Sequence, residues 1–280
     1  MVKPTQYVIF DNISRDNISL LLNEFDKDLK NISGKCMDVG CGPGDITNDI
    51  LLPFLDPNVT MIGTDIMEEM VEYANKTYGD KERLKFEALD IQTKKLPEKY
   101  ISEFDHIFSF HVLQWCNDVH QTFRNIYHML RPGKTMLISS IARQVPIFES
   151  LEAMAEDTRY AAYMGNKQKY VGSFHYSTRP YEELKEVLED IGFQVHHCSH
   201  RNLSSFLNTQ QFLSMITSQY TFAFLDKMPN NLREEFMNEF ARRFDEKKDK
   251  EYKDRQSDYK LHDDIPFYYT VLVAYAQKCS

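Results

Sequence analysis

Short apolar runs alternate with amphipathic stretches between Lys35 and Ile141. The runs have the length of buried strands, and the stretches between them carry apolar residues at helical spacing. This alternation is typical of repeated strand–helix units around a parallel sheet. The expected strands are Lys35–Val39, Val59–Thr64, Leu84–Ala88, His106–Phe110 and Thr135–Ile141, and the expected helices are Thr47–Phe54, Glu68–Tyr78 and Val119–Leu130.

A second group of elements follows nearer the C-terminus. A helix at Tyr181–Ile191, a strand at Phe193–His197 and a last strand at Tyr268–Ala276 complete the sheet at seven strands. Two segments rich in Met, Tyr and Phe interrupt the rhythm, at about 142–180 and 201–260. We therefore predict a single α/β domain over residues 1–280, with a Rossmann-like sheet and two helical cap insertions.

Composition and charge exclude several classes of protein. The chain has 280 residues, 42% of them hydrophobic, with a net charge of −9 and a pI near 5.5. Such a balance argues against a nucleic-acid-binding protein. The sequence lacks a signal-peptide pattern and an apolar run of membrane-spanning length, which predicts a cytoplasmic protein without stable membrane insertion. Its five cysteines are odd in number and lack CxxC spacing, so we expect neither disulfides nor a metal site.

The strongest chemical signal is Asp38-Val39-Gly40-Cys41-Gly42-Pro43-Gly44, between a strand and a helix. Glycines at alternate positions allow a tight turn and a close approach to a ligand. A dinucleotide fold would place its third glycine at position 45, where this chain has Asp45. The spacing favours S-adenosylmethionine over NAD, with Asp38 suited to the cofactor's ammonium group. Taken alone, the turn also fits an ordinary loop.

Acidic residues also end the next two expected strands. Asp65, followed by Ile66, suits both hydroxyls of a ribose, and Asp90 suits an adenine amino group while Ile91 packs on the ring. The alternative is that each Asp caps the helix after it. The candidate cofactor-binding residues are Asp38, Gly40, Cys41, Gly42, Gly44, Asp65, Ile66, Asp90, Ile91 and Phe110.

The fourth strand leads into a segment that carries the chain's single tryptophan. His111, Gln114 and Trp115 are expected where a methyl acceptor would meet the cofactor, and we take them as candidate catalytic residues. Gln and Trp donate hydrogen bonds without titrating near neutral pH, so they can orient a carboxylate. The alternative is that Trp115 anchors the core and that His111 is a satisfied, half-buried histidine.

These residues resemble a known family. Asp38–Gly44, Asp65, Asp90 and Leu113-Gln114-Trp115 look like class I S-adenosylmethionine-dependent methyltransferases that esterify carboxylates, such as trans-aconitate methyltransferase. A closer likeness is to the insect juvenile hormone acid O-methyltransferases. It covers nearly the whole chain and extends to Tyr7, Ser14-Arg15-Asp16, Phe174-His175-Tyr176-Ser177 before Arg179-Pro180, Phe212–Met215 and Leu232–Phe236. The resemblance implies a class I methyltransferase fold and S-adenosyl-L-methionine as cofactor.

One position departs from that family. A glutamine usually stands two residues before the Arg-Asp pair and helps the tryptophan hold the substrate carboxylate, whereas this chain has Ile13. Because an aliphatic side chain donates no hydrogen bond, the departure implies a changed acceptor, weak activity or none. The candidate substrate-binding residues are Ile13, Tyr7, Trp115 and Tyr176.

The prediction is an O-methyltransferase that esterifies a small apolar carboxylic acid, such as juvenile hormone acid, farnesoic acid or a fatty acid, and acts as a monomer or homodimer. Apolar cap residues would suit such an acceptor or merely pack the cap onto the sheet. They are Met154, Tyr160, Tyr163, Met164, Phe206, Phe212, Met215, Phe222 and Phe224. Two alternatives are methylation of a phenol or amine, and a cofactor- or lipid-binding paralogue without turnover.

Overall fold

The described strands form one mixed sheet, in the order β3-β2-β1-β4-β5-β7-β6. A computed structural model describes residues 4–5, 12–80, 82–206, 208–217, 220–255 and 265–280. The strands are β1 (Lys35–Val39), β2 (Thr60–Asp65), β3 (Leu84–Ala88), β4 (Phe104–Phe110), β5 (Leu130–Arg143), β6 (Phe193–Ser205) and β7 (Phe267–Lys278). β1 to β5 run parallel, and β7 pairs antiparallel with both β5 and β6.

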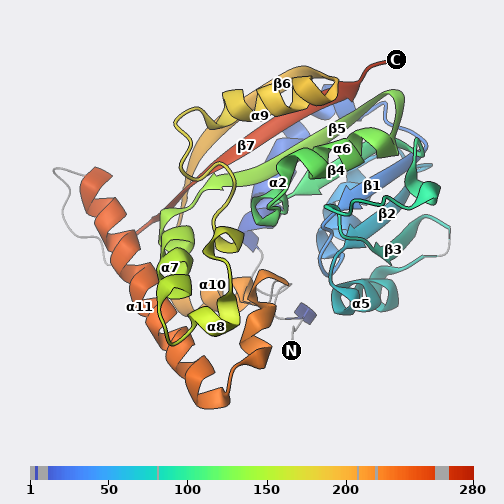
Figure 1. The fold of residues 1–280 in the computed structure, drawn as a ribbon. Coiled ribbons are helices and arrows are strands. Elements are labelled where there is room, and N and C mark those ends of the chain that lie inside the picture. The colour runs from blue at the N-terminus through green and yellow to red at the C-terminus, as the bar shows by residue number, and fades with distance from the viewer. Residues whose placement is uncertain (1–3, 6–11, 81, 207, 218–219, 256–264) are drawn as a thin grey trace.

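Helices cover both faces of this sheet because the central strands are apolar on both sides. In β5, Leu137 packs toward one face, whereas Met136 and Ile138 pack toward the other. The first face is covered by α2 (Asn12–Glu24), α4 (Leu52–Phe54) and α5 (Glu68–Tyr78), and the second by α6 (Val119–Met129) and α9 (Pro180–Ile191). Figure 1 shows α6 and α9 lying along the second face.

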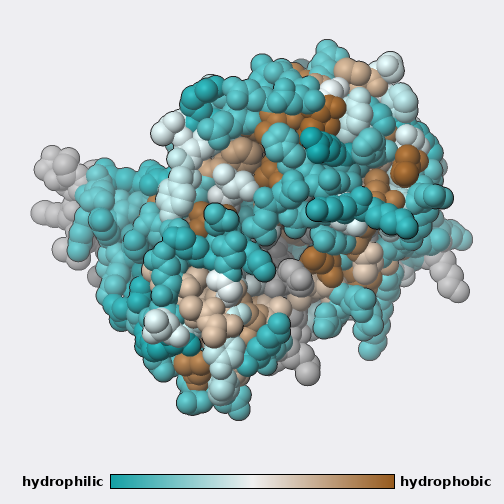
Figure 2. Space-filling model, viewed as in Figure 1, coloured by the Kyte–Doolittle hydropathy of each residue, from teal (hydrophilic) through white to brown (hydrophobic). Residues whose placement is uncertain are grey.

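The remaining helices gather beyond the carboxyl ends of the parallel strands and form the cap (Figure 1). They are α7 (Val145–Glu156), α8 (Ala161–Met164), η4 (Lys167–Tyr170), α10 (Thr209–Ile216), η5 (Tyr220–Lys227) and α11 (Asn230–Arg255). Phe222, Phe236 and Phe240 fill the cap interior and are nearly inaccessible to solvent. Figure 2 shows hydrophilic side chains over most of the face in view, with apolar side chains in separate patches.

Short elements complete the chain. They are α3 (Asp26–Leu29), the π-helical turn η1 (Thr47–Leu51), and the 3₁₀ turns η2 (Glu98–Tyr100) and η3 (Leu113–Trp115). The helix expected over Thr47–Phe54 is thus divided between η1 and α4. Pro53 lies at this junction, and its ring removes the backbone N–H that a continuous α-helix would use.

All seven expected strands are confirmed, but β6 is longer than predicted. It continues past His197 to Ser205, paired with β7 along its length, so the segment from Arg201 to Ser205 belongs to the sheet and not to the cap. β6 is an edge strand with one exposed face, and its polar residues alternate with half-buried ones. Polar residues on the exposed face hide such a strand from a search for apolar runs.

Candidate active site

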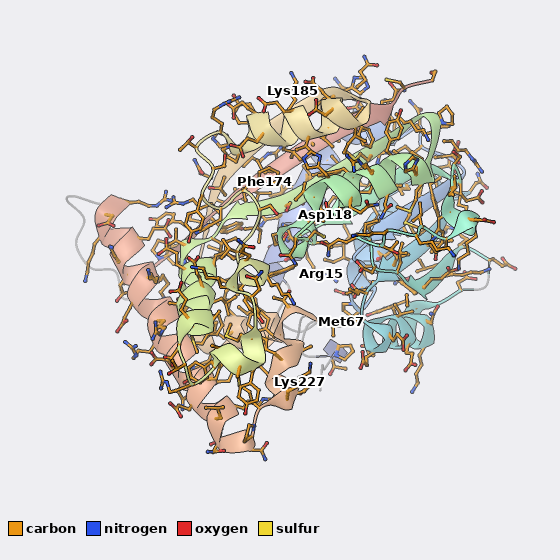
Figure 3. The ribbon with its side chains drawn as sticks, viewed as in Figure 1. Arg15, Met67, Asp118, Phe174, Lys185 and Lys227 are labelled. Atoms are coloured by element: carbon orange, nitrogen blue, oxygen red, sulfur yellow. The ribbon has the colours of Figure 1, made fainter. Side chains whose placement is uncertain are left out.

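A large cavity lies between the sheet and the cap, at the carboxyl ends of β1, β2, β3 and β4. It has a volume of about 350 Å³. The sheet contributes residues from the segments after each strand, including Gly40, Gly42, Asp65, Ile66, Asp90 and Ile91. The cap contributes Met164, Lys169, Tyr170, Thr221, Ala223, Phe224 and Lys227. Met67 and Lys227 line it from α5's side and from the cap (Figure 3).

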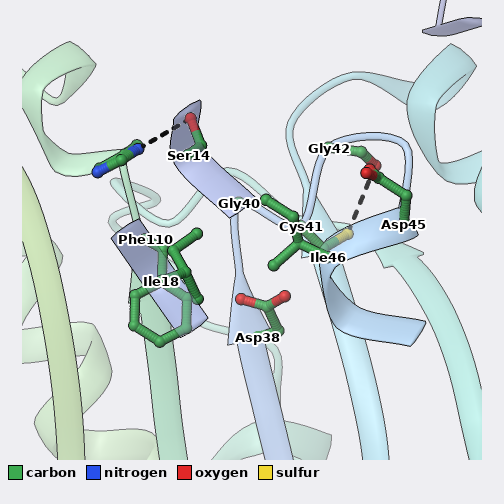
Figure 4. A pocket seen from close by; sticks show the side chains of 10 residues that line it. Ser14, Ile18, Asp38, Gly40, Cys41, Gly42, Asp45, Ile46 and Phe110 are labelled. Carbon is green, nitrogen blue, oxygen red and sulfur yellow. Dashed lines mark hydrogen bonds between the residues drawn. The ribbon is translucent and has the colours of Figure 1, made fainter. Parts of the chain in front are cut away.

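A smaller hollow of about 30 Å³ adjoins it beside the glycine loop. Asp38, Cys41 and Phe110 line this hollow from the sheet, and Ser14 and Ile18 line it from α2 (Figure 4). Gly40, Gly42 and His111 line both spaces, which are therefore neighbouring parts of one site.

The glycines of the loop have different roles. A Cβ on Gly40 would lie 2.1 Å from Val112 Cγ2, and one on Gly44 would lie 2.8 Å from Phe86. These two glycines therefore let neighbouring segments pack closely. A Cβ on Gly42 would meet nothing within 4 Å, and its φ is +54°. Gly42 thus borders open space that a ligand can fill.

Two carboxylates hold this loop in shape. Asp38 is 3% exposed and accepts a hydrogen bond from Thr47 Oγ1 at 2.6 Å. Burial raises the pKa of Asp38 to about 7, although the bond from Thr47 opposes that rise. Asp65 accepts from the backbone N–H groups of Gly42 at 3.0 Å and Met67 at 2.9 Å. Burial raises the pKa of Asp65 as well.

The third acidic position lies farther along the same edge. Asp90 is exposed and accepts from the backbone N–H of Gln92 at 2.8 Å. Ile91 is 6% exposed, and Asn125 Nδ2 donates to its carbonyl at 2.7 Å. Asp90 and Ile91 both line the large cavity.

His111 has a strained backbone with φ of +56°. Its N–H donates to the carbonyl of Ser139 at 2.9 Å, and its Nδ1 lies 3.2 Å from Ser14 Oγ (Figure 4). Burial lowers the pKa of His111 to about 4, so the imidazole is neutral at physiological pH. A neutral ring can orient a neighbouring group without adding a charge to the site.

Trp115 lines the large cavity and packs edge to face against two cap residues. The ring centroids lie 5.8 Å from Phe148 and 6.3 Å from Phe222. Its Nε1 is buried and has no hydrogen-bond partner among the described residues. Burying an N–H donor without a partner costs roughly 1–3 kcal/mol, so this atom is suited to a ligand that accepts a hydrogen bond.

Comparison with known proteins defines the family. A model described as "Methyltransferase domain" matches residues 30–192. Juvenile hormone acid O-methyltransferase of Drosophila melanogaster is 31% identical over 244 residues, which are 86% of this chain and 82% of that protein. The chain belongs to the juvenile hormone acid O-methyltransferase family. The Bombyx mori juvenile hormone acid O-methyltransferase is 33% identical over 165 residues, covering 59% of this chain and 58% of that protein.

Other matches place the family among class I methyltransferases. Malonyl-[acyl-carrier protein] O-methyltransferase of Bacillus anthracis is 26% identical and covers 77% of this chain and 76% of that protein. Phosphoethanolamine N-methyltransferase 2 of Haemonchus contortus, solved with S-adenosyl-L-methionine, matches with a TM-score of 0.52 and 18% identity over 94% of this chain and 53% of that one. The fold and cofactor predictions are confirmed: this is an S-adenosylmethionine-dependent methyltransferase.

The predicted cofactor residues of this juvenile hormone acid O-methyltransferase family member fall into three sets. Those lining the large cavity are Gly40, Gly42, Asp65, Ile66, Asp90 and Ile91. Those lining the small hollow without reaching the large one are Asp38, Cys41 and Phe110. Gly44 lines neither, because it packs against Phe86 and Ala74 behind the loop. Open space at Gly42, beside acidic Asp65 and buried Asp38, fits the cofactor.

Two predicted residues do not reach the cavity. Gln114 is 6% exposed, donates to the carbonyl of His111 at 2.6 Å and accepts from Ser140 Oγ at 3.3 Å. Its amide thus supports the His111 segment from behind and does not face an acceptor. Tyr176 is 65% exposed, and its hydroxyl donates to Glu152. Tyr7 and the side chain of Ile13 lie outside the described residues.

Lining residues that were not predicted as site residues come from several places, among them α2, α5, the turn after β4 and the cap. Ser14 and Ile18 come from α2, Val112 from the turn after β4, and Lys169 and Lys227 from the cap. Of the nine apolar cap residues considered, Met164 and Phe224 line the cavity. Met154, Tyr160 and Phe222 are buried in the core. Packing therefore accounts for these three residues.

The described residues contain no group of three or more His, Cys, Asp or Glu side chains placed to hold a metal ion. Among the described helices, none is long and apolar enough to cross a membrane.

Proposed function

We propose that this methyltransferase esterifies the carboxylate of a small apolar acid, such as juvenile hormone acid, farnesoic acid or a fatty acid. The observation that carries the proposal is the buried Nε1 of Trp115, a donor without a described partner in a residue that lines the cavity. A carboxylate oxygen is a strong acceptor for such a donor. The relatives named for juvenile hormone acid support the same acceptor class.

In this proposal the sheet side of the cavity holds the cofactor. The carboxylate of Asp65 binds the ribose hydroxyls, Asp90 and Ile91 contact the adenine, and the space beside Gly42 takes the centre of the molecule. Asp38 in the adjoining hollow faces the ammonium group. When bound, S-adenosylmethionine supplies a methyl group on a positively charged sulfur.

The chain's own residues then have to position the acceptor and exclude water. A carboxylic acid with a pKa near 4 is already ionised at about pH 7, so the protein needs no general base. The lowered pKa of His111 makes its imidazole a weak base, which agrees with a reaction that needs none. Trp115 orients one oxygen, while Met164 and Phe224 offer apolar contacts to the rest of the acceptor. Gln114 acts as a positioning residue, because it holds the His111 carbonyl.

The test is a methyl-transfer screen with labelled cofactor over apolar acids, phenols and amines. We expect labelled esters from apolar acids, and a loss of about tenfold or more in kcat/KM when Trp115→Phe removes the indole donor but keeps an aromatic ring. Tyr176→Phe is the control, since Tyr176 lines neither part of the site. Products from phenols or amines alone would contradict the proposal, and tight cofactor binding without any product would indicate a binding protein.

A further inference from the structure

Helix α2 covers the part of the site nearest the glycine loop. Ser14 and Ile18 form one wall of the small hollow, opposite Asp38 and Gly42 (Figure 4). A ligand that occupies this hollow and extends past Gly42 into the large cavity would be enclosed by α2 at one end. Movement of α2 would then control how such a ligand leaves.

Arg15 connects α2 to the segment that follows the glycine loop. Its Nη1 lies 2.6 Å from Asp45 Oδ2, and its Nη2 lies 3.0 Å from Asp49 Oδ2. The side chain of Asp45 is 2% exposed and that of Arg15 is 26% exposed, so the inner ion pair is largely out of water. Shielded pairs that also share a hydrogen bond are stronger than exposed ones.

Asp45 is closely connected to the cofactor-binding carboxylates. It directly follows Gly44, and two residues later the hydroxyl of Thr47 donates a hydrogen bond to Asp38. Burial raises the pKa of Asp45, and the guanidinium of Arg15 opposes that rise. The charge of Asp45 also acts on Asp38. Arg15 therefore compensates negative charge at the point where the loop meets α2.

We infer that Arg15 is a positioning residue which, through Asp45, holds α2 closed over the glycine loop and thereby slows the release of the cofactor and of its product, S-adenosylhomocysteine. The inference rests on the cofactor placement given in the proposed function and does not depend on the acceptor. A closed lid acts mainly on the dissociation rate of the ligand beneath it. Product release is the rate-limiting step in many enzymes.

The chain offers a matched control at the other end of the same helix. Arg201 of β6 pairs with Glu24, the last residue of α2, at 2.8 Å, and its side chain is 29% exposed. Both arginines thus connect α2 to the sheet, and their side chains are exposed to a similar extent. Arg201, however, pairs with Glu24, at the opposite end of α2 from Arg15. Arg15→Ala removes the ion pairs at one end of α2, and Arg201→Ala removes the ion pair at the other end.

The experiment measures dissociation of S-adenosylhomocysteine by stopped flow, using the fluorescence of Trp115, the single tryptophan. We expect Arg15→Ala to accelerate dissociation about tenfold or more, with a smaller change in association, and Arg201→Ala to leave both rates near wild type. An unchanged dissociation rate in Arg15→Ala, or equal acceleration in both variants, would overturn the inference.

A double-mutant cycle tests the route through Asp45. Arg15→Ala should have little further effect in an Asp45→Asn background, whereas independent and additive effects would show that Arg15 does not act through Asp45. The more conservative Arg15→Lys should give an intermediate rate, because Lys cannot bridge Asp45 and Asp49 with a planar fork. Normal cofactor binding by Gly42→Ala would instead disprove the cofactor placement itself.

Discussion

Gly42 and Gly165 share a positive φ and open space where a side chain would begin. Their φ angles are +54° and +71°, and an added Cβ would meet nothing within 4 Å at either position. The two differ in place, because Gly42 lines the cavity and Gly165 ends α8 in the cap. They form a matched pair for separating backbone strain from loss of ligand space.

We predict that Gly42→Ala weakens S-adenosylmethionine binding at least about tenfold, whereas Gly165→Ala leaves it unchanged. Each variant should lose roughly 1–2 kcal/mol of stability, because an L-residue is strained at positive φ. Titration calorimetry measures the first effect and thermal denaturation the second. Equal binding by the two variants would show that the space beside Gly42 is not used by the cofactor.

The raised pKa of Asp38 predicts pH-dependent cofactor binding. With a pKa of about 7, this carboxyl is largely protonated at lower pH and gains the charge that attracts an ammonium group as the pH rises. Affinity should therefore increase several-fold between about pH 6 and 7.5, as measured by calorimetry. Asp38→Asn should bind weakly with little pH dependence. A wild-type affinity that stays constant over this range would contradict the assignment.

The raised pKa of Asp38 also predicts that removing its charge stabilises the folded protein. The pKa of Asp38 is about 7 in the folded protein and 3.8 in an ordinary aspartate. The free energy of unfolding therefore falls as the pH rises from about 4 to about 7, and this group causes no further loss at higher pH. Asp38→Asn should therefore raise Tm at about pH 8 by 2 °C or more. The two proteins should differ least near pH 4. A lower Tm for Asp38→Asn at pH 8 would refute the prediction.

Ile13→Gln should raise kcat/KM for apolar carboxylic acids by about ten- to a hundredfold. The next residue along α2 is Ser14, whose Oγ lies 3.2 Å from His111 Nδ1, so this part of the helix adjoins the site. A glutamine at position 13 would add a donor for the acceptor carboxylate. Leu20→Gln on the exposed side of α2 is the control, since Leu20 is 68% exposed. An unaltered kcat/KM in Ile13→Gln would show that residue 13 does not contact the acceptor carboxylate.

Parts of the parallel half of the sheet could be predicted because their strands carry a clear burial pattern: β1 is mostly buried, whereas β3 alternates buried with exposed residues. Both strands match their expected bounds. β5 begins earlier than expected, at Leu130, and passes through Pro132 and Gly133. Both residues normally argue against a strand interior, but pairing with β7 starts only at Thr135, so Pro132 removes no hydrogen bond between these two strands.

The site was predictable where it follows the strand ends and unpredictable where it depends on long-range packing. Asp65 ends β2 and Asp90 lies two residues after β3, so the parallel order brings them to one edge. The contributions of Ser14 and Ile18 depend on how α2 crosses the sheet, which no local pattern records. The side chain of Gln114 turned toward Ser140 because its amide could be satisfied there, and sequence does not show which partner an amide will find.

The strand order has a consequence for synthesis on the ribosome. β7 separates β5 from β6 and supplies the backbone hydrogen bonds between them, yet it is translated after both and after the cap helices. A nascent chain that has emerged only as far as β6 therefore presents two unpaired strand edges, which favour aggregation. Closing the sheet requires a long-range pairing step, and such steps are slow. Productive folding of this protein consequently waits for the translation of residues 267–278.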